Sequence, residues 1–108
     1  MRTNSYDGKW KGEVVFYDPL TIAQEAEWEY ALARLGRAQK EGGGASAVTL
    51  AILPGILTCV SEWKLKDFPK DVTVDNFPAR PKTERVKLLT WLIEQITDIY
   101  KEDDDPNE

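Results

Sequence analysis

The sequence has 108 residues, which is enough for one domain with a single hydrophobic core. Hydrophobic residues make up 42% of the chain and charged residues 31%, a composition typical of a globular protein and unlike that of a disordered one. The 19 acidic residues outnumber the 14 lysines and arginines, so the net charge of −5 disfavours binding to nucleic acids and to anionic membranes.

The first predicted element is a short β-ribbon over about residues 1–17. Aromatic and β-branched residues dominate Trp10 to Tyr17, a composition typical of a strand. The turn-forming pair Asp7-Gly8 precedes this segment, so we expect Arg2 to Tyr6 to pair back on it as a first strand. An isolated ribbon is only marginally stable, and this one must therefore pack against helices.

The second predicted element is a helix from Leu20 to Lys40. Thr21 and Gln24 have the spacing of a capping box, and the glycines at 42–44 end the helix. Its apolar residues fall on two adjacent stripes. One stripe consists of Ile22, Ala26, Tyr30 and Ala33, and the other of Trp28, Leu32 and Leu35.

The segment Ala45 to Val60 is apolar on nearly all sides, which predicts a helix in the middle of the core. Pro54 removes one backbone hydrogen bond and Gly55 weakens the helix further, so we expect this central helix to be bent or broken. A helix that spans a membrane needs about 18 or more consecutive apolar residues, and this segment is shorter. We expect Ser61 to Lys66 to end the helix in a more polar register.

The segment Asp67 to Pro81 is predicted to be an extended connection, because residues that precede prolines avoid the α region. The apolar residues expected to hold it on the helices are Phe68, Val72, Val74 and Phe77. Thr83 to Lys101 is predicted to be the last helix, since apolar residues recur in it at spacings of three and four. Trp91 lies beside this stripe, as a candidate for a second contact surface.

These elements predict a mainly α fold in one domain, residues 1–101. In it the N-terminal β-ribbon is followed by an orthogonal bundle of three to four helices, with the bent, apolar helix at its centre. The last residues, 102–108, carry mostly acidic side chains and no apolar anchor, so we expect a disordered acidic tail.

Residues with catalytic chemistry are scarce. The chain has no histidine, the most common general base and metal ligand. Cys59 lies in the apolar segment, where burial suppresses thiol reactivity. The glycines at 42–44 lack the lysine and the preceding strand of a phosphate-binding loop, and the acids at 103–105 lack the alternating ligands of a calcium loop. We therefore predict no catalytic, cofactor-binding or metal-binding residues, and a protein that is not an enzyme.

Two features favour binding to another protein. Four tryptophans are many for a chain of this length, and tryptophan is enriched among interface anchors, although large aromatic residues also fill cores. Cations cluster at 80–87, before the last helix, and acids follow that helix. Such polarity suits head-to-tail association of copies, or else a solvated surface without a partner.

The order of several short motifs along the chain is distinctive. An aromatic strand at Trp10 to Tyr17 leads through Asp18-Pro19-Leu20-Thr21 into a helix with acids and an aromatic at Glu25 to Tyr30. An apolar helix ending in Cys59-Val60-Ser61-Glu62-Trp63 follows, then a link rich in proline and a closing helix with Trp91-Leu92-Ile93-Glu94-Gln95-Ile96. This order resembles that of the small tail assembly chaperones of long-tailed bacteriophages and prophages, and the resemblance covers roughly Trp10 to Tyr100.

The resemblance implies a protein without enzymatic activity that works in the host cytoplasm and is absent from the mature virion. Its partner would be the phage tape measure protein, which it binds and keeps soluble, and it would help to recruit tail tube subunits. A long, apolar, helical partner requires apolar grooves on the chaperone. The candidate partner-binding residues are Trp28, Trp63 and Trp91, with Arg80 and Arg85 as charges at the rim.

Alternative functions stay open from the sequence. The chain is also compatible with a minor phage structural or connector protein, which would be present in virions, and with a small cytoplasmic regulatory module that binds another protein. A small enzyme would need carboxylate or cofactor chemistry that the sequence does not reveal. Self-association is compatible with each of these functions, whereas we expect no binding to nucleic acid or membrane.

Overall fold

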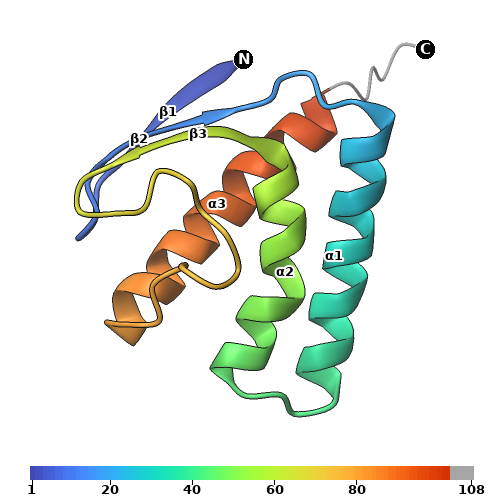
Figure 1. Cartoon of the computed structure of the whole chain (residues 1–108). Coiled ribbons are helices and arrows are strands. Elements are labelled where there is room, and N and C mark those ends of the chain that lie inside the picture. Colours follow the sequence, from blue (N-terminus) through green and yellow to red (C-terminus); the bar gives the residue numbers. More distant parts are fainter. Residues whose placement is uncertain (103–108) are drawn as a thin grey trace.

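The computed structural model of the chain describes residues 1–102 and shows three helices beneath a small sheet (Figure 1). The elements in chain order are β1 (Arg2–Tyr6), β2 (Gly12–Phe16), α1 (Ile22–Lys40), α2 (Ala45–Cys59), β3 (Val60–Leu65) and α3 (Lys82–Glu102). The sheet is antiparallel with the order β1-β2-β3. Helices α1 and α2 form an antiparallel hairpin below it, and α3 runs obliquely beside them (Figure 1).

The mainly α bundle predicted from the sequence is therefore wrong. The described chain has an α+β fold, because a third strand extends the N-terminal ribbon to a sheet that forms a layer over the helices. The part of the chain from Ser61 to Lys66, expected to end the central helix, contains most of that strand.

The spacing of buried residues in β3 explains this error. Strand β3 pairs with β2 through Val14↔Trp63 and Phe16↔Val60, and the register shifts between these pairs. The β-bulge inserts one residue, so the inward-facing Val60 and Trp63 are three positions apart rather than two. Apolar residues three positions apart also mark one face of a helix. After a long apolar helix, this spacing therefore favours one more helical turn over a strand.

The N-terminal β-ribbon is confirmed, with a longer connection than expected. β1 pairs with β2 from Arg2↔Phe16 to Tyr6↔Gly12, so residues 7–11 form the connection instead of a tight turn at Asp7-Gly8. Gly12 has φ +157°, and a Cβ atom there would lie 2.2 Å from the Lys64 carbonyl oxygen. Only glycine fits where β2 and β3 approach so closely.

Helix α1 begins and ends close to the predicted residues. Thr21 is the N-cap and forms the predicted capping box with Gln24, each side chain accepting a hydrogen bond from the other residue's backbone N–H. Trp28 and Ala31 face the core, whereas Ile22 and Tyr30 of the first predicted stripe are 83% and 63% exposed. The helix thus buries the side that carries Trp28.

Helix α2, predicted to be bent or broken at Pro54, runs through this residue as one helix, so of the two predicted outcomes the break is absent. The Thr58 hydroxyl donates a hydrogen bond to the Pro54 carbonyl oxygen at 3.0 Å. Ile52, Leu53 and Ile56 are almost completely buried, which confirms a helix in the core. Among the described helices none has both the length and the apolar character needed to cross a membrane.

Gly55 brings α1 and α2 into close contact. A Cβ atom at this position would lie 2.4 Å from the Ala31 Cβ and 3.3 Å from both the Glu27 carbonyl oxygen and Cε3 of Trp28. The indole of Trp28 is fully buried beside this contact. The small residues Gly55 and Ala31 therefore set the distance between the two helices.

The connection between β3 and α3 packs on the sheet through aromatic rings. The Phe68 ring lies 5.5 Å from both Trp10 and Trp63 and 5.7 Å from Phe77, measured between ring centroids. Phe68 meets Trp10 and Phe77 edge to face and stacks on Trp63, and both arrangements favour aromatic contacts. Val74, predicted to pack in the same way, is instead 42% exposed.

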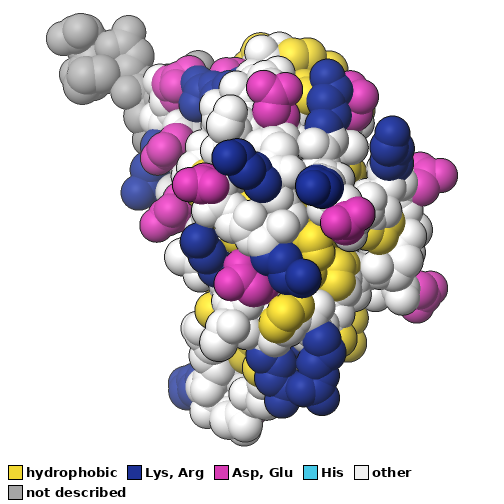
Figure 2. Space-filling view, turned by 90° about the vertical axis from the view of Figure 1, so that its left-hand side faces the viewer, with side chains coloured by type: hydrophobic (Ala, Val, Ile, Leu, Met, Phe, Trp, Pro, Cys, Tyr) yellow, Lys and Arg dark blue, Asp and Glu magenta, His cyan; other side chains and the backbone are white. Residues whose placement is uncertain are grey.

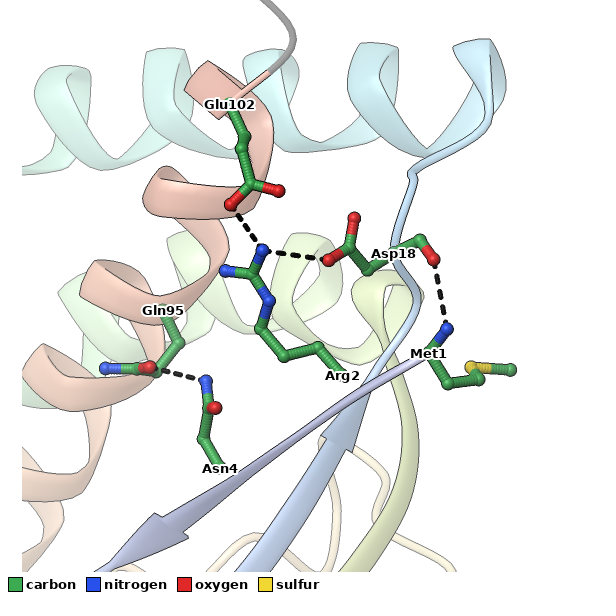
Figure 3. A network of polar contacts seen from close by, with 6 residues as sticks. All are labelled: Met1, Arg2, Asn4, Asp18, Gln95 and Glu102. Carbon is green, nitrogen blue, oxygen red and sulfur yellow. Dashed lines mark hydrogen bonds and ion pairs between the residues drawn. The ribbon is translucent and has the colours of Figure 1, made fainter.

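Helix α3 lies against β1 and β2. Its predicted apolar stripe is buried, and the Trp91 ring lies 5.1 Å from Tyr6 and 5.9 Å from Phe16 between centroids. Asn4 donates a hydrogen bond to Gln95 at 2.6 Å (Figure 3). Polar as well as apolar contacts therefore attach the first strand to the last helix.

The end of α3 is tied to the N-terminal region by charges. Arg2 of β1 forms ion pairs with Asp18 and with Glu102, and the Met1 ammonium donates a hydrogen bond to the Asp18 carbonyl oxygen at 3.0 Å (Figure 3). Glu102, expected to start the disordered tail, is the last residue of the helix. The rest of that predicted tail, 103–108, lies outside the described residues.

The close contact at Gly55 leads to a stability prediction. Gly55→Ala should lower the free energy of unfolding by about 2 kcal/mol, because the added methyl overpacks the contact with Ala31 and this outweighs the helix propensity of alanine. Urea unfolding followed by circular dichroism measures the change.

Gly36→Ala in α1 is the matched control, since a Cβ atom there meets nothing within 4 Å. It should raise the free energy of unfolding by about 1 kcal/mol. If the Gly55 variant proved as stable as the Gly36 variant, α1 and α2 would be farther apart than described.

Candidate binding surfaces

The structure separates the five partner-binding residues predicted from the sequence. Trp28 and Trp63 lie in the core, with 0% and 6% of their surface exposed. Arg85 is also buried, at 3% exposure, and thus lies below the surface rather than at a rim. Arg80 is exposed, and Trp91 is partly buried.

Trp91 borders a surface pocket of about 490 Å³ between β1 and α3. The pocket is lined by Ser5, Tyr6, Asp7, Lys87, Thr90, Trp91 and Glu94. Lys87 donates a hydrogen bond to the Asp7 carbonyl oxygen at 3.0 Å, which holds the β1–β2 connection against α3. The Trp91 ring packs on Tyr6 and Phe16, so most of its contacts are within the chain.

A more apolar groove lies where the three helices meet, and we call it the helical groove. Its volume is about 290 Å³, and it is lined by Leu35, Gln39, Ala45, Val48, Thr49, Ile52, Val86, Leu89, Thr90 and Ile93. Val86 is 51% exposed within it. The residues from α2 and α3 recur every three or four positions, so each helix presents one face to the groove.

Cationic side chains are frequent in two segments that contribute residues to the groove. These segments, 34–41 at the end of α1 and 80–87 before and within α3, hold seven cations and two carboxylates, although Arg85 and Lys87 line other pockets. The cations are Arg34, Arg37, Lys40, Arg80, Lys82, Arg85 and Lys87, and the carboxylates are Glu41 and Glu84. On the face drawn in Figure 2, Lys and Arg side chains are spread over the surface, and one group of them near the lower end has no acidic side chain beside it. The two segments together hold five more cations than carboxylates, within a chain whose net charge is −5.

A second, smaller pocket lies on the neighbouring face of α2, and we call it the Arg85 pocket. Its volume is about 190 Å³, and it is lined by Ser46, Thr49, Leu50, Leu53, Val74, Phe77, Pro78, Ala79 and Arg85. Nη1 of Arg85 donates a hydrogen bond to the Ala79 carbonyl oxygen at 3.1 Å. Arg85, predicted to be a charge at the rim, is on the buried side of α3, and its spacing of four from the apolar Leu89 is the signal in the sequence for that position.

In the described part of the chain, the cysteine is buried and the possible metal ligands do not form a cluster. Cys59 is fully buried, and burial raises the pKa of its thiol to about 12. Within residues 1–102 no three His, Cys, Asp or Glu side chains lie close enough to hold a metal ion.

Comparisons with protein families, with characterised proteins and with solved structures find no match to this chain.

The buried thiol leads to a prediction on reactivity. Iodoacetamide at pH 8 should modify Cys59 at least about 100-fold more slowly in the folded protein than in urea, because only the thiolate reacts. Mass spectrometry of timed samples measures the rate. Equal rates in both states would show that Cys59 is accessible.

The same pKa determines how stability depends on pH. The folded thiol keeps its proton up to a pKa of about 12, above the ordinary value of 9.0, so the unfolded chain loses its proton first as the pH rises. The contribution of the Cys59 thiol to the free energy of unfolding is therefore complete below pH 9 and declines from pH 9 to 12.

The variant Cys59→Ala has no thiol to titrate. Its free energy of unfolding, measured by urea unfolding at several pH values, should therefore fall less steeply between pH 9 and 12 than that of the natural sequence.

Proposed function

We propose that the protein binds an apolar helical segment of a partner protein in the helical groove, without catalysis. The observation that carries the proposal is the groove itself, in which apolar side chains from α1, α2 and α3 border one partly open volume. Grooves between helices are a common binding site for amphipathic helices, whose anchors recur every three or four residues.

The charges around the groove support an acidic partner. The segments 34–41 and 80–87, which reach the groove at Leu35, Gln39 and Val86, carry more cations than carboxylates, and complementary charges steer a partner and set its orientation. We therefore propose that the bound helix presents apolar residues to Val86 and Ile93 and carries carboxylates at its flanks.

Within this class of function, we propose that the partner is a phage tape measure protein and that the chain is a tail assembly chaperone in the host cytoplasm. The support is the resemblance in element order and short motifs, together with a groove suited to an apolar helix. A tape measure protein offers many such helical segments, and repeated weak contacts give a coat that tail tube subunits are able to displace.

Val86→Glu tests the groove as the binding site. The change removes an exposed apolar contact and places a carboxylate where the partner is proposed to be acidic, so binding should weaken about tenfold, or about 1.4 kcal/mol. The measurement is the soluble fraction of the proposed tape measure partner, which a tail assembly chaperone would have as a gene neighbour, when it is co-expressed with each variant, followed by titration of the purified pair.

Ile22→Glu is the matched control, because Ile22 is an apolar helical residue that is 83% exposed and lies outside the groove. It should solubilise the partner as well as the natural sequence does. Equal losses in both variants, or none in Val86→Glu, would contradict binding in the helical groove. Lack of any binding to the tape measure protein would contradict the chaperone role.

A further inference from the structure

We infer that the Arg85 pocket binds a carboxylate attached to a small apolar group. The site is separate from the helical groove, although Thr49 borders both. The ligand is either a free short-chain carboxylic acid or the carboxylate at the end of a polypeptide, since both present the same chemistry to the pocket.

The guanidinium of Arg85 is buried and only partly paired. Nη1 is bonded to the Ala79 carbonyl oxygen, whereas Nε and Nη2 are buried and have no hydrogen-bond acceptor among the described residues. A buried charge without a partner is costly, so an arginine in this state is stabilised by any anion that reaches it. Nε and Nη2 also form the edge of the guanidinium that binds the two oxygens of a carboxylate.

The residues around Arg85 also favour the binding of an anion. Every other residue that lines the pocket in the described part of the chain is uncharged, so no carboxylate repels the ligand. The first turn of α2, which includes Ser46, has no acidic residue and no side-chain cap, so its backbone dipole adds positive potential at the pocket. The only formal charge on the pocket wall is that of Arg85.

The size and the lining of the pocket determine what accompanies the carboxylate. A volume of about 190 Å³ is smaller than the ~300 Å³ or more of typical drug-sized sites. Leu50, Leu53 and Phe77 contribute apolar surface beside Arg85. The pocket therefore suits a branched group of a few carbon atoms, and it disfavours inorganic phosphate, whose remaining oxygens would lose hydration against apolar walls.

A ligand reaches the arginine by displacing part of the connection before α3. Nε and Nη2 are buried, and Val74, Phe77, Pro78 and Ala79 of this connection border the pocket. Val74 and Ala79 in this segment are exposed. Residues 73–76 are exposed and suited to local movement, whereas Phe77 is held by its ring contacts with Trp63 and Phe68.

Nuclear magnetic resonance of the full chain tests the proposal through the Arg85 Nε–H signal. The probes are isovalerate, its neutral amide isovaleramide, and inorganic phosphate, each titrated at constant ionic strength. We expect isovalerate to shift the signal with saturation, and isovaleramide and phosphate to bind at least about tenfold more weakly.

Two variants separate binding from folding. Arg85→Met keeps the length of the side chain and removes the charge, so isovalerate binding, followed by backbone amide signals of α2, should be lost while the fold and the melting temperature are retained. Leu50→Trp fills the mouth of the pocket from a residue that is 56% exposed, and should abolish binding with Arg85 still present. Val86→Glu in the helical groove should leave isovalerate binding unchanged.

A peptide that ends in leucine, compared with the same peptide as a C-terminal amide, distinguishes the two sources. If the peptide acid binds more tightly than isovalerate, the ligand of the pocket is the C-terminal carboxylate of a polypeptide. If it binds more weakly, the ligand is a free short-chain carboxylic acid. The proposal is overturned if isovalerate gives no saturable shift, if the amide binds equally well, if phosphate binds more tightly, or if Arg85→Met binds isovalerate normally. These results are independent of partner binding in the groove.

Discussion

The contact between α1 and α2 at Gly55 is the constraint on which the rest of the structure depends. Without a side chain at Gly55, the backbone of α2 approaches Ala31, and the fully buried indole of Trp28 fits beside it. This contact places α2 in the middle of the helical layer, and Val60 follows Cys59 directly into the sheet. The position of one helix thus sets the position of β3, and through β3 the closure of the core by the sheet.

The two candidate sites follow from this placement of α2. The N-terminal half of α2 presents Val48 and Ile52 to the helical groove, and Ser46 and Leu53 to the Arg85 pocket. Helix α3 contributes to both sites through Val86 and Arg85, which are neighbours in sequence with different burial. An extended apolar groove beside cations suits a protein ligand, whereas a small pocket with one incompletely paired guanidinium suits a single anionic group.

Local signals in the sequence were sufficient for most elements but not for the fold. The capping box at Thr21, the ribbon of β1 and β2 and the apolar stripe of α3 are encoded by nearby residues, and these predictions are confirmed. Strand β3 depends on pairing with β2 across a bulge, and a bulge disguises the alternation of a strand. Which side of each helix is buried also depends on distant contacts. The burial of Trp28 in the core and the pocket around Arg85 were therefore not predictable from nearby residues.

Native-state hydrogen exchange measures most directly whether α2 is the central element. The amide protons of Ile56, Leu57 and Cys59 should exchange only through global unfolding, with a free energy equal to that from urea unfolding, and the paired amides of β2 should match them. Exchange of the α2 amides through a local opening, at a lower free energy than those of the sheet, would contradict an α2 helix that is held in place by its contact with α1.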